Sequence, residues 1–248
     1  MKEYVKTQTE QGIATIEFFH PNSNALPSAI LAELAKAIKT CGDNEDAQVI
    51  ILKSGRDRAF CAGASFDEMK KMKNKKEATA FFMGFANLIN TIRSLNKFIL
   101  AKVQGKVVGG GVGLVAACDI AFALEAASVK LSELSIGIGP YVIEPAVSRK
   151  IGAAAFRELS LDANKWKSAK WAKKKGLYRS VSKSKETLNQ KVLKTATRLA
   201  SYPQKANTSL RKLHWKETDH WDILLPKNAE ITAKLALEKA AQDILRKI

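Results

Sequence analysis

A glycine-rich turn near the middle of the chain has the composition of a site that binds anionic oxygen. Gly109, Gly110 and Gly111 stand between a branched apolar run of strand length, Phe98–Val103, and a run of small residues typical of a short helix, Val112–Cys118. Glycine has no Cβ, so three in a row leave backbone N–H groups uncovered at the positive end of that helix. Such groups can bind and stabilise an oxyanion.

A single carboxylate follows this turn in an otherwise apolar stretch. Glu133 is flanked in sequence by Leu131, Leu134, Ile136 and Ile138, with little other charge nearby. Burial of that kind raises the pKa of a carboxyl group toward the range useful for acid–base chemistry. An oxyanion-binding turn and one such carboxylate together predict proton transfer next to a carbonyl group.

Strand and helix signals alternate through Pro140, which predicts an α/β fold. The apolar patterns predict strands at Gly12–Phe19, Gln48–Lys53, Phe98–Val103 and Asp119–Ala123. They predict a helix that begins at Pro27, followed by helices over Phe66–Lys76, Ala80–Leu95 and Val112–Cys118.

Downstream of Gly152 the strand signal fades and helical patterns dominate. The predicted helices are Ala153–Leu161, Ala169–Lys175, Lys185–Ser201 and Ala229–Arg246, with a short apolar piece at Leu177–Val181. No linker rich in Pro, Gly or Ser and no fixed repeat divides the chain. We expect an α/β core over residues 1–190 and a helical C-terminal region over residues 191–248.

The composition is that of a globular protein. The 248 residues are 46% hydrophobic, yet no apolar run approaches the ~20 residues of a membrane span. The N-terminal segment has no apolar core of a signal peptide. Cys41, Cys61 and Cys118 are odd in number and form no CxxC pair, which indicates free thiols. We therefore expect a cytoplasmic protein without a membrane segment.

The net charge is high: 41 Lys and Arg less 24 Asp and Glu gives +17. Nucleic acid, a polyanionic small molecule or a lysine-rich solubilising surface would each account for this balance. The lysine groups at 70–76 and 170–175 have only Trp166 and Trp171 as nearby aromatic platforms. Solvated helix faces are the default interpretation of these groups, and RNA contact is the minority one.

Other chemistries fit the sequence less well. Gly111–Ala116 matches a GxGxxA dinucleotide-binding pattern, but the following helix is short and the motif lies in mid-chain. No GxSxG motif occurs, and His20, His214 and His220 are the only histidines. The spacing of His214 and His220 does not place both on one helix face, so no metal site is predicted.

Three motifs in order resemble the enoyl-CoA hydratase/isomerase (crotonase) family over nearly the whole chain. Ser23–Leu26 is similar to that family's N-terminal turn for coenzyme A, and Ala59–Ala64 to its first oxyanion loop. The third motif, Gly105–Asp119, resembles its GxxxGGG…CD signature. The resemblance implies a spiral of ββα units whose C-terminal helices build trimers, often paired into hexamers.

The resemblance also implies roles for individual residues. The backbone N–H groups of Ala64 and Gly110 would form an oxyanion hole for a thioester carbonyl, and Glu133 would be the acid–base residue. The implied contacts with the acyl-CoA substrate come from Asn24, Ala25, Leu26, Ala62, Gly63, Gly109, Gly113 and Pro140. No cofactor is implied beyond the coenzyme A of the substrate itself.

The chain departs from the family pattern where its first catalytic glutamate would stand, because that position is Gly113. Ser65 likewise stands where the family usually has Asp. A single glutamate is similar to Δ3,Δ2-enoyl-CoA isomerases, whereas the segment 132–143 resembles hydratases of 3-methylglutaconyl-CoA most closely. We expect hydration of an enoyl-CoA, with double-bond migration as the alternative and Glu144, Asp67 or Glu68 as a second carboxylate. An RNA-binding or a catalytically silent family member stays open as well.

Overall fold

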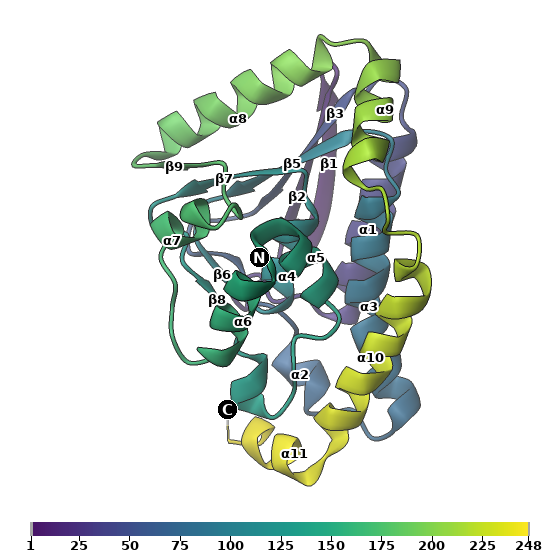
Figure 1. The fold of residues 1–248 in the computed structure, drawn as a ribbon, viewed down its shortest axis with the longest axis vertical. Helices are drawn as coiled ribbons and strands as arrows, with labels where there is room; N and C mark the ends of the chain where they lie inside the picture. Colours follow the sequence, from purple (N-terminus) through teal and green to yellow (C-terminus); the bar gives the residue numbers. More distant parts are fainter. Residues whose placement is uncertain (1, 248) are drawn as a thin grey trace.

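The computed structural model describes residues 2–247, and the strands in that range form two sheets (Figure 1). The larger sheet has the order β1-β2-β3-β5-β7-β9, in which β1 and β2 pair antiparallel and the other neighbours pair parallel. Its strands are β1 (Tyr4–Glu10), β2 (Ile13–Phe19), β3 (Val49–Ser54), β5 (Phe98–Val103), β7 (Ile120–Leu124) and β9 (Ser180–Ser182).

Both faces of the larger sheet are covered by helices, as its apolar strands require. Helix α8 (Lys185–Ala200) lies across one face, where Leu188 and Val192 pack against Ile51 and Leu100 (Figure 1). The opposite face carries the main core, which includes α1 (Ser28–Asp43) and α3 (Lys75–Arg93). Alternate residues of β2, β3, β5 and β7 therefore enter two separate apolar clusters.

A second, smaller sheet holds β4 (Ala59–Cys61), β6 (Lys106–Val108) and β8 (Val129–Lys130), all parallel, with β6 in the middle. Each of these strands follows a strand of the larger sheet in the chain: β3 precedes β4, β5 precedes β6, and β7 precedes β8. The chain thus winds through both sheets in three successive turns. Short helical segments follow the small strands: α2 (Phe66–Met69), α4 (Gly110–Ala117) and the 3₁₀ turn η1 (Glu133–Ile136).

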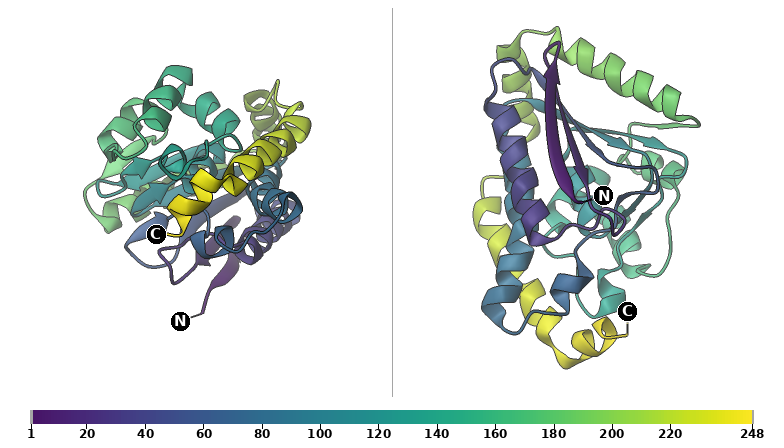
Figure 2. Two further views of the ribbon diagram at one scale, coloured as in Figure 1. Left: turned by 90° about the horizontal axis from the view of Figure 1, so that it is seen from below. Right: turned by 180° about the vertical axis from the view of Figure 1, so that it is seen from behind.

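The remaining helices follow η1 in the chain. They are α5 (Glu144–Ile151), α6 (Ala153–Leu161), α7 (Ala169–Lys174), α9 (Gln204–His214), α10 (Trp221–Leu237) and α11 (Lys239–Leu245). Helix α10 packs along α3, and α11 packs against η1, so the C-terminal end returns to the core (Figure 2). The boundary expected at residue 190 falls inside α8.

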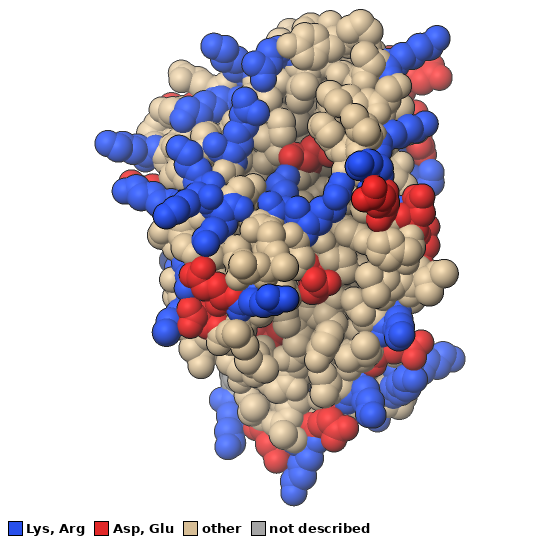
Figure 3. Space-filling view, viewed as in Figure 1, with Lys and Arg blue, Asp and Glu red and all other residues tan. Residues whose placement is uncertain are grey.

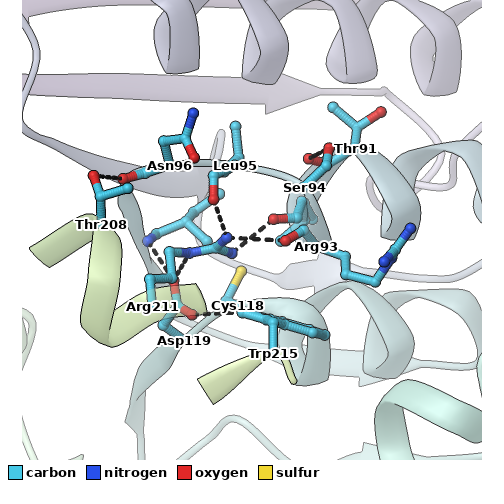
Figure 4. A network of polar contacts seen from close by, with 12 residues as sticks. Thr91, Arg93, Ser94, Leu95, Asn96, Cys118, Asp119, Thr208, Arg211 and Trp215 are labelled. Atoms are coloured by element: carbon cyan, nitrogen blue, oxygen red, sulfur yellow. Dashed lines mark hydrogen bonds and ion pairs between the residues drawn. The ribbon is translucent and has the colours of Figure 1, made fainter. Parts of the chain in front are cut away.

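A buried ion pair attaches α9 to the core (Figure 4). The Arg211 Nε donates to Asp119 Oδ2 at 2.9 Å, and its Nη groups donate to carbonyls at the end of α3, including that of Ile92 at 2.6 Å. Asp119 also accepts from the Ile99 N–H and from the Trp215 indole. Because both side chains are almost fully buried, their charges belong to the protein interior and not to its charged surface.

The predicted α/β pattern is confirmed in its long elements, and two of the predicted helices are wrong in their bounds. The helix expected over Phe66–Lys76 is two helices, because α2 ends at Met69 and Asn74 caps a new helix. The helix expected over Ala229–Arg246 begins eight residues earlier, at Trp221, and is interrupted at Glu238, whose backbone is extended. The strand β1 and the helices α5 and α9 were not predicted.

None of the helices in residues 2–247 combines the length and the low polarity that crossing a bilayer requires.

Candidate active site

The candidate site lies where the three strands of the small sheet end. Ala64 follows β4, Gly110 follows β6 and Glu133 follows β8. Parallel strands end at the same edge of a sheet, so three segments that are far apart in sequence converge there. The Gly109 N–H donates to the Lys130 carbonyl at 2.9 Å, which ties the second segment to the third.

Two backbone amides at this edge are free to bind a ligand. A Cβ built on Gly63 would lie 3.7 Å from the Gly110 nitrogen and 3.0 Å from the Val108 oxygen, so the two loops are in close approach. Within the part of the chain that the structure describes, neither the Ala64 nor the Gly110 N–H donates a hydrogen bond. Gly110 is also the first residue of α4, where unpaired N–H groups carry the positive end of the helix dipole.

The carboxylate of Glu133 lies against the backbone of Gly109. A Cβ on Gly109 would be 3.0 Å from Glu133 Oε1 and 3.7 Å from Oε2. Gly109 has φ +53° and ψ −123°, a conformation that side-chain-bearing residues rarely adopt. A glycine is therefore needed here for two reasons, the backbone angles and the space that the carboxylate occupies.

Glu133 has the environment of an acid–base residue. Its Oε2 is buried and has no hydrogen-bond partner among residues 2–247. Burial raises the pKa of its carboxyl group from 4.5 to about 7, although a hydrogen bond from its own backbone N–H partly opposes the shift. At neutral pH, such a group is present both as acid and as base.

A mostly apolar cavity of about 530 Å³, open mouth included, joins these groups. The two amide-bearing loops, Ser132 and Glu133 form one wall. The other walls consist of residues from α2, α3, η1, the segment that follows η1, and α10. They are Phe66, Met69, Phe82, Phe85, Ile136, Ile138, Pro140, Val142, Ile143 and Thr232. Among the described residues that line it, Glu133 is the only ionisable one.

The cavity has apolar walls and a few convergent polar groups, the composition typical of a small-molecule site. Free amides, one unpaired carboxylate and apolar walls would suit a carbonyl compound whose neighbouring carbon exchanges a proton. No group of three or more His, Cys, Asp or Glu side chains among residues 2–247 is arranged to hold a metal ion.

Comparison with known proteins identifies the family to which the chain belongs. The family description "Enoyl-CoA hydratase/isomerase" matches residues 8–243, which is nearly the whole chain. The chain belongs to this family.

Two curated relatives show the range of reactions within it. A probable enoyl-CoA hydratase of Bacillus subtilis is 32% identical over 156 residues, which are 62% of this chain and 60% of that protein. The peroxisomal Delta(3,5)-Delta(2,4)-dienoyl-CoA isomerase of Arabidopsis thaliana is 27% identical over 206 residues, 77% of this chain and 72% of that protein. The match to the first relative thus spans about three fifths of its length.

A solved structure confirms the fold. The enoyl-CoA hydratase of Bacillus halodurans superposes with a TM-score of 0.92 at 20% identity, covering 99% of this chain and 100% of the other. The expected α/β fold of the family, with a helical C-terminal part, is therefore confirmed.

The structure brings together most of the site residues that the family resemblance implies. Those that line the cavity are Ala62, Gly63, Ala64, Gly109, Gly110, Glu133 and Pro140. Asn24, Ala25, Leu26 and Gly113 do not line it.

Asn24 lies outside the cavity lining and supports the site through hydrogen bonds to the backbone. Its side chain is buried and accepts from the His20 N–H, while its amide donates to the carbonyls of Gly55 and Ala59. Leu26, fully buried, donates its N–H to the Gly63 carbonyl at 2.8 Å. This turn therefore holds the loop that presents the Ala64 amide.

The side chain of Ile143 occupies the space next to Gly113. A Cβ on Gly113 would lie 2.4 Å from Ile143 Cγ2 and 2.6 Å from Ile143 Cβ. The methyl groups of Ile143 thus fill the space beside the helix where the family pattern has its first glutamate. The cavity is apolar on that side.

The three carboxylates considered as a second acid lie outside the cavity lining. Glu68 accepts from the Ser28 N–H at 2.9 Å, and Asp67 accepts from the Asn22 amide. Glu144 is the first residue of α5. Ser65, in place of the usual Asp, caps α2 by accepting from the Glu68 N–H.

The apolar walls were not identified from the sequence as part of a site. Phe82 and Phe85 belong to a helical stripe that indicates core packing, and nothing in the stripe separates a core wall from a cavity wall. Thr232 comes from a helix almost a hundred residues after Glu133, so only the folded chain brings it to the site.

Proposed function

We propose that this chain transfers a proton at the carbon next to the carbonyl of an enoyl-CoA thioester. One observation carries the proposal: the unpaired Glu133 carboxylate lies in an apolar cavity that also holds the free amides of Ala64 and Gly110. This is the set of groups that forming and protonating an enolate requires.

The two amides would bind the thioester oxygen and stabilise the negative charge that grows on it. Backbone donors need no reorganisation as the charge develops, and the apolar walls strengthen their effect. The loss of one donor of this kind typically lowers a rate by ~10²–10³. Glu133, with a pKa raised to about 7, would take the proton from Cα or return it.

Of the two reactions open to such a site, the cavity favours migration of the double bond. A single base suffices, because it removes a proton from Cα and delivers it to Cγ of the same enolate. Hydration needs in addition a group that positions water at the third carbon. The Ile143 methyl groups occupy the region next to Gly113, and no carboxylate besides Glu133 lines the cavity within residues 2–247.

Hydration is the second candidate, and the relatives favour it. The Bacillus subtilis relative is named a probable enoyl-CoA hydratase. In this reaction Glu133 would protonate Cα and would also have to orient the water. The resemblance of segment 132–143 makes 3-methylglutaconyl-CoA the first substrate to test.

One assay panel separates the candidates: crotonyl-CoA, 3-methylglutaconyl-CoA and a 3-enoyl-CoA, each with wild type, Glu133→Gln and Glu144→Gln. We expect turnover of the 3-enoyl-CoA, and Glu133→Gln should lower it by ~10²–10⁴ while CoA-ester binding is kept. Glu144→Gln is the matched control, since Glu144 does not line the cavity and should leave the rate unchanged.

The outcomes are distinct. Turnover of crotonyl-CoA in preference to the 3-enoyl-CoA would support hydration instead. A fully active Glu133→Gln variant would overturn the proposal, and no turnover of any ester would leave a silent family member. The trimeric or hexameric assembly and the cytoplasmic location implied by the sequence remain predictions beside it.

A further inference from the structure

The charges around the cavity restrict the substrate beyond its thioester. Coenzyme A carries several phosphates, and no positively charged side chain lines the cavity within residues 2–247, so we place coenzyme A outside it. The group that enters beyond the thioester carbonyl is the acyl chain. Its chemistry has to match the walls past Ala64, Gly110 and Glu133.

Those walls offer no positive charge. Within residues 2–247, no lysine, arginine or histidine lines the cavity although the chain carries a net charge of +17. Its hydroxyls are those of Ser132 and Thr232, and the Thr232 hydroxyl already donates to the Asn228 carbonyl at 2.9 Å. The only charged group that an acyl chain meets is the carboxylate of Glu133.

The inner walls are also well packed. Met69, Phe82, Phe85, Val142 and Ile143 are each at most 5% exposed, so they cannot swing out into solvent without opening the core. A charged end on the acyl chain would lose its water against these side chains. The carboxylate of Glu133 would then repel a negative charge at short range.

We infer that the acyl group of the substrate is uncharged, and that thioesters with a second carboxylate are excluded. This inference rests on the proposed function, because it assigns the cavity to an acyl-CoA. It separates the substrate from 3-methylglutaconyl-CoA, whose acyl chain ends in a carboxylate. The relevant class is that of enoyl esters whose acyl chain, straight or branched, carries no charged group.

Binding of two unreactive esters tests the inference without relying on turnover. Butyryl-CoA and succinyl-CoA have acyl chains of the same carbon number and differ in the terminal carboxylate. Titration calorimetry with the whole chain should give a dissociation constant at least tenfold lower for butyryl-CoA. Free coenzyme A serves as the reference for the part that lies outside the cavity.

A variant identifies the source of the discrimination. Glu133→Gln keeps the size of the side chain and removes its charge, so the butyryl-to-succinyl preference should shrink but keep its direction, because the apolar walls remain. Thr232→Lys places an ammonium group at the cavity wall and should reverse the preference. If Thr232→Lys fails to fold, the ratios of the two dissociation constants in wild type and in Glu133→Gln still test the inference.

The inference fails if wild type binds succinyl-CoA as tightly as butyryl-CoA, since a cation would then have to reach the cavity from elsewhere, for example from a second copy of the chain. If neither thioester binds more tightly than free coenzyme A, the proposed function fails and the inference fails with it.

Discussion

At the scale of single residues, the proposed chemistry depends on Glu133. Its place in an otherwise apolar stretch makes it visible in the sequence as an unusual carboxylate. The physical cause of its raised pKa, a buried Oε2 with no donor, depends on the cavity around it. The sequence predicts the role of Gly109 in the turn. It does not predict the contact of Gly109 with Glu133, because 23 residues separate the two in sequence.

The pH dependence of the rate distinguishes the two reactions. Double-bond migration starts with a carboxylate that accepts the Cα proton, so its kcat/KM should rise with pH and level off above about 7. If hydration is the reaction, Glu133 must begin as the acid that protonates Cα, and kcat/KM should fall above about 7. Initial rates across the pH range measure this. A profile that is flat through neutrality would exclude Glu133 from proton transfer in either direction.

The same group makes stability depend on pH. The folded chain holds the Glu133 proton up to pH of about 7, whereas the unfolded chain loses it near 4.5. The folded state therefore binds more protons between these values, and its free energy of unfolding falls as the pH rises through them. Urea unfolding should show Glu133→Gln gaining stability relative to wild type as the pH rises from about 4.5 to about 7. A difference between the two proteins that does not change with pH would contradict the assigned burial.

Gly113 gives a residue-scale test of how the cavity is filled. Gly113→Glu alone should destabilise the chain by ~1–3 kcal/mol, because its Cβ would overlap Ile143. Combining it with Ile143→Ala should recover part of that loss, and the pair should raise the hydration rate of crotonyl-CoA. Thermal unfolding and a hydration assay check both points. A single Gly113→Glu variant as stable as wild type would show that Ile143 does not confine this position.

At the scale of elements, the ends of β4, β6 and β8 position the site. The runs at 98–103 and 120–124 were predictable as strands because buried parallel strands are continuously apolar. The two- and three-residue strands β4, β6 and β8 are too short for a sequence pattern. Their pairing, which brings Ala64 to Gly110, is a tertiary property. Local composition indicated the Gly109–Gly111 turn and Glu133, and motif resemblance added the loop that carries Ala64.

Helix α9 was not predicted from the sequence, for a related reason. Its buried residues are Asn207 and Arg211, both polar, so no apolar stripe marks the helix. Arg211 is satisfied by Asp119 and by carbonyls at the end of α3, partners that come from distant parts of the chain (Figure 4).

This network predicts a large effect of a single change. Arg211→Met removes the partner of buried Asp119 and the donors for the α3 carbonyls, so it should lower the free energy of unfolding by ~3–5 kcal/mol. Arg246→Met breaks an exposed pair with Asp243 and should cost less than ~1 kcal/mol. Urea denaturation compares the two variants. Equal effects would mean that the Arg211 network contributes no more than a surface contact.

At the scale of the whole molecule, the charge needs an explanation apart from the site. Figure 3 shows lysine and arginine side chains gathered over the region of α7, β9 and α8, on the face that Figure 1 presents. Some of these are paired, since Lys170 contacts Glu125 at 2.8 Å and Lys175 contacts Glu158 at 3.7 Å. The side chain of Trp166 is 40% exposed, and the Nζ atoms of Lys106 and Lys130 lie within 5 Å of its ring centroid.

We expect this surface to attract RNA only through charge. Affinity for a short single-stranded RNA should fall steeply as salt rises and be lost by roughly 0.2 M, and Trp166→Ala should leave the affinity nearly unchanged. Fluorescence anisotropy across a salt series measures both. Tight binding that persists at physiological salt and is lost in Trp166→Ala would instead establish a stacking site and an RNA-binding function.

In the proposed function, the fold as a whole brings one carboxylate and two amides to a single thioester, and removal of the Cα proton measures that directly. With 3-butenoyl-CoA deuterated at the carbon next to the carbonyl, NMR should show wild type removing deuterium from that carbon, while Glu133→Gln retains it on the same timescale. Loss of deuterium in Glu133→Gln at the wild-type rate would contradict the account.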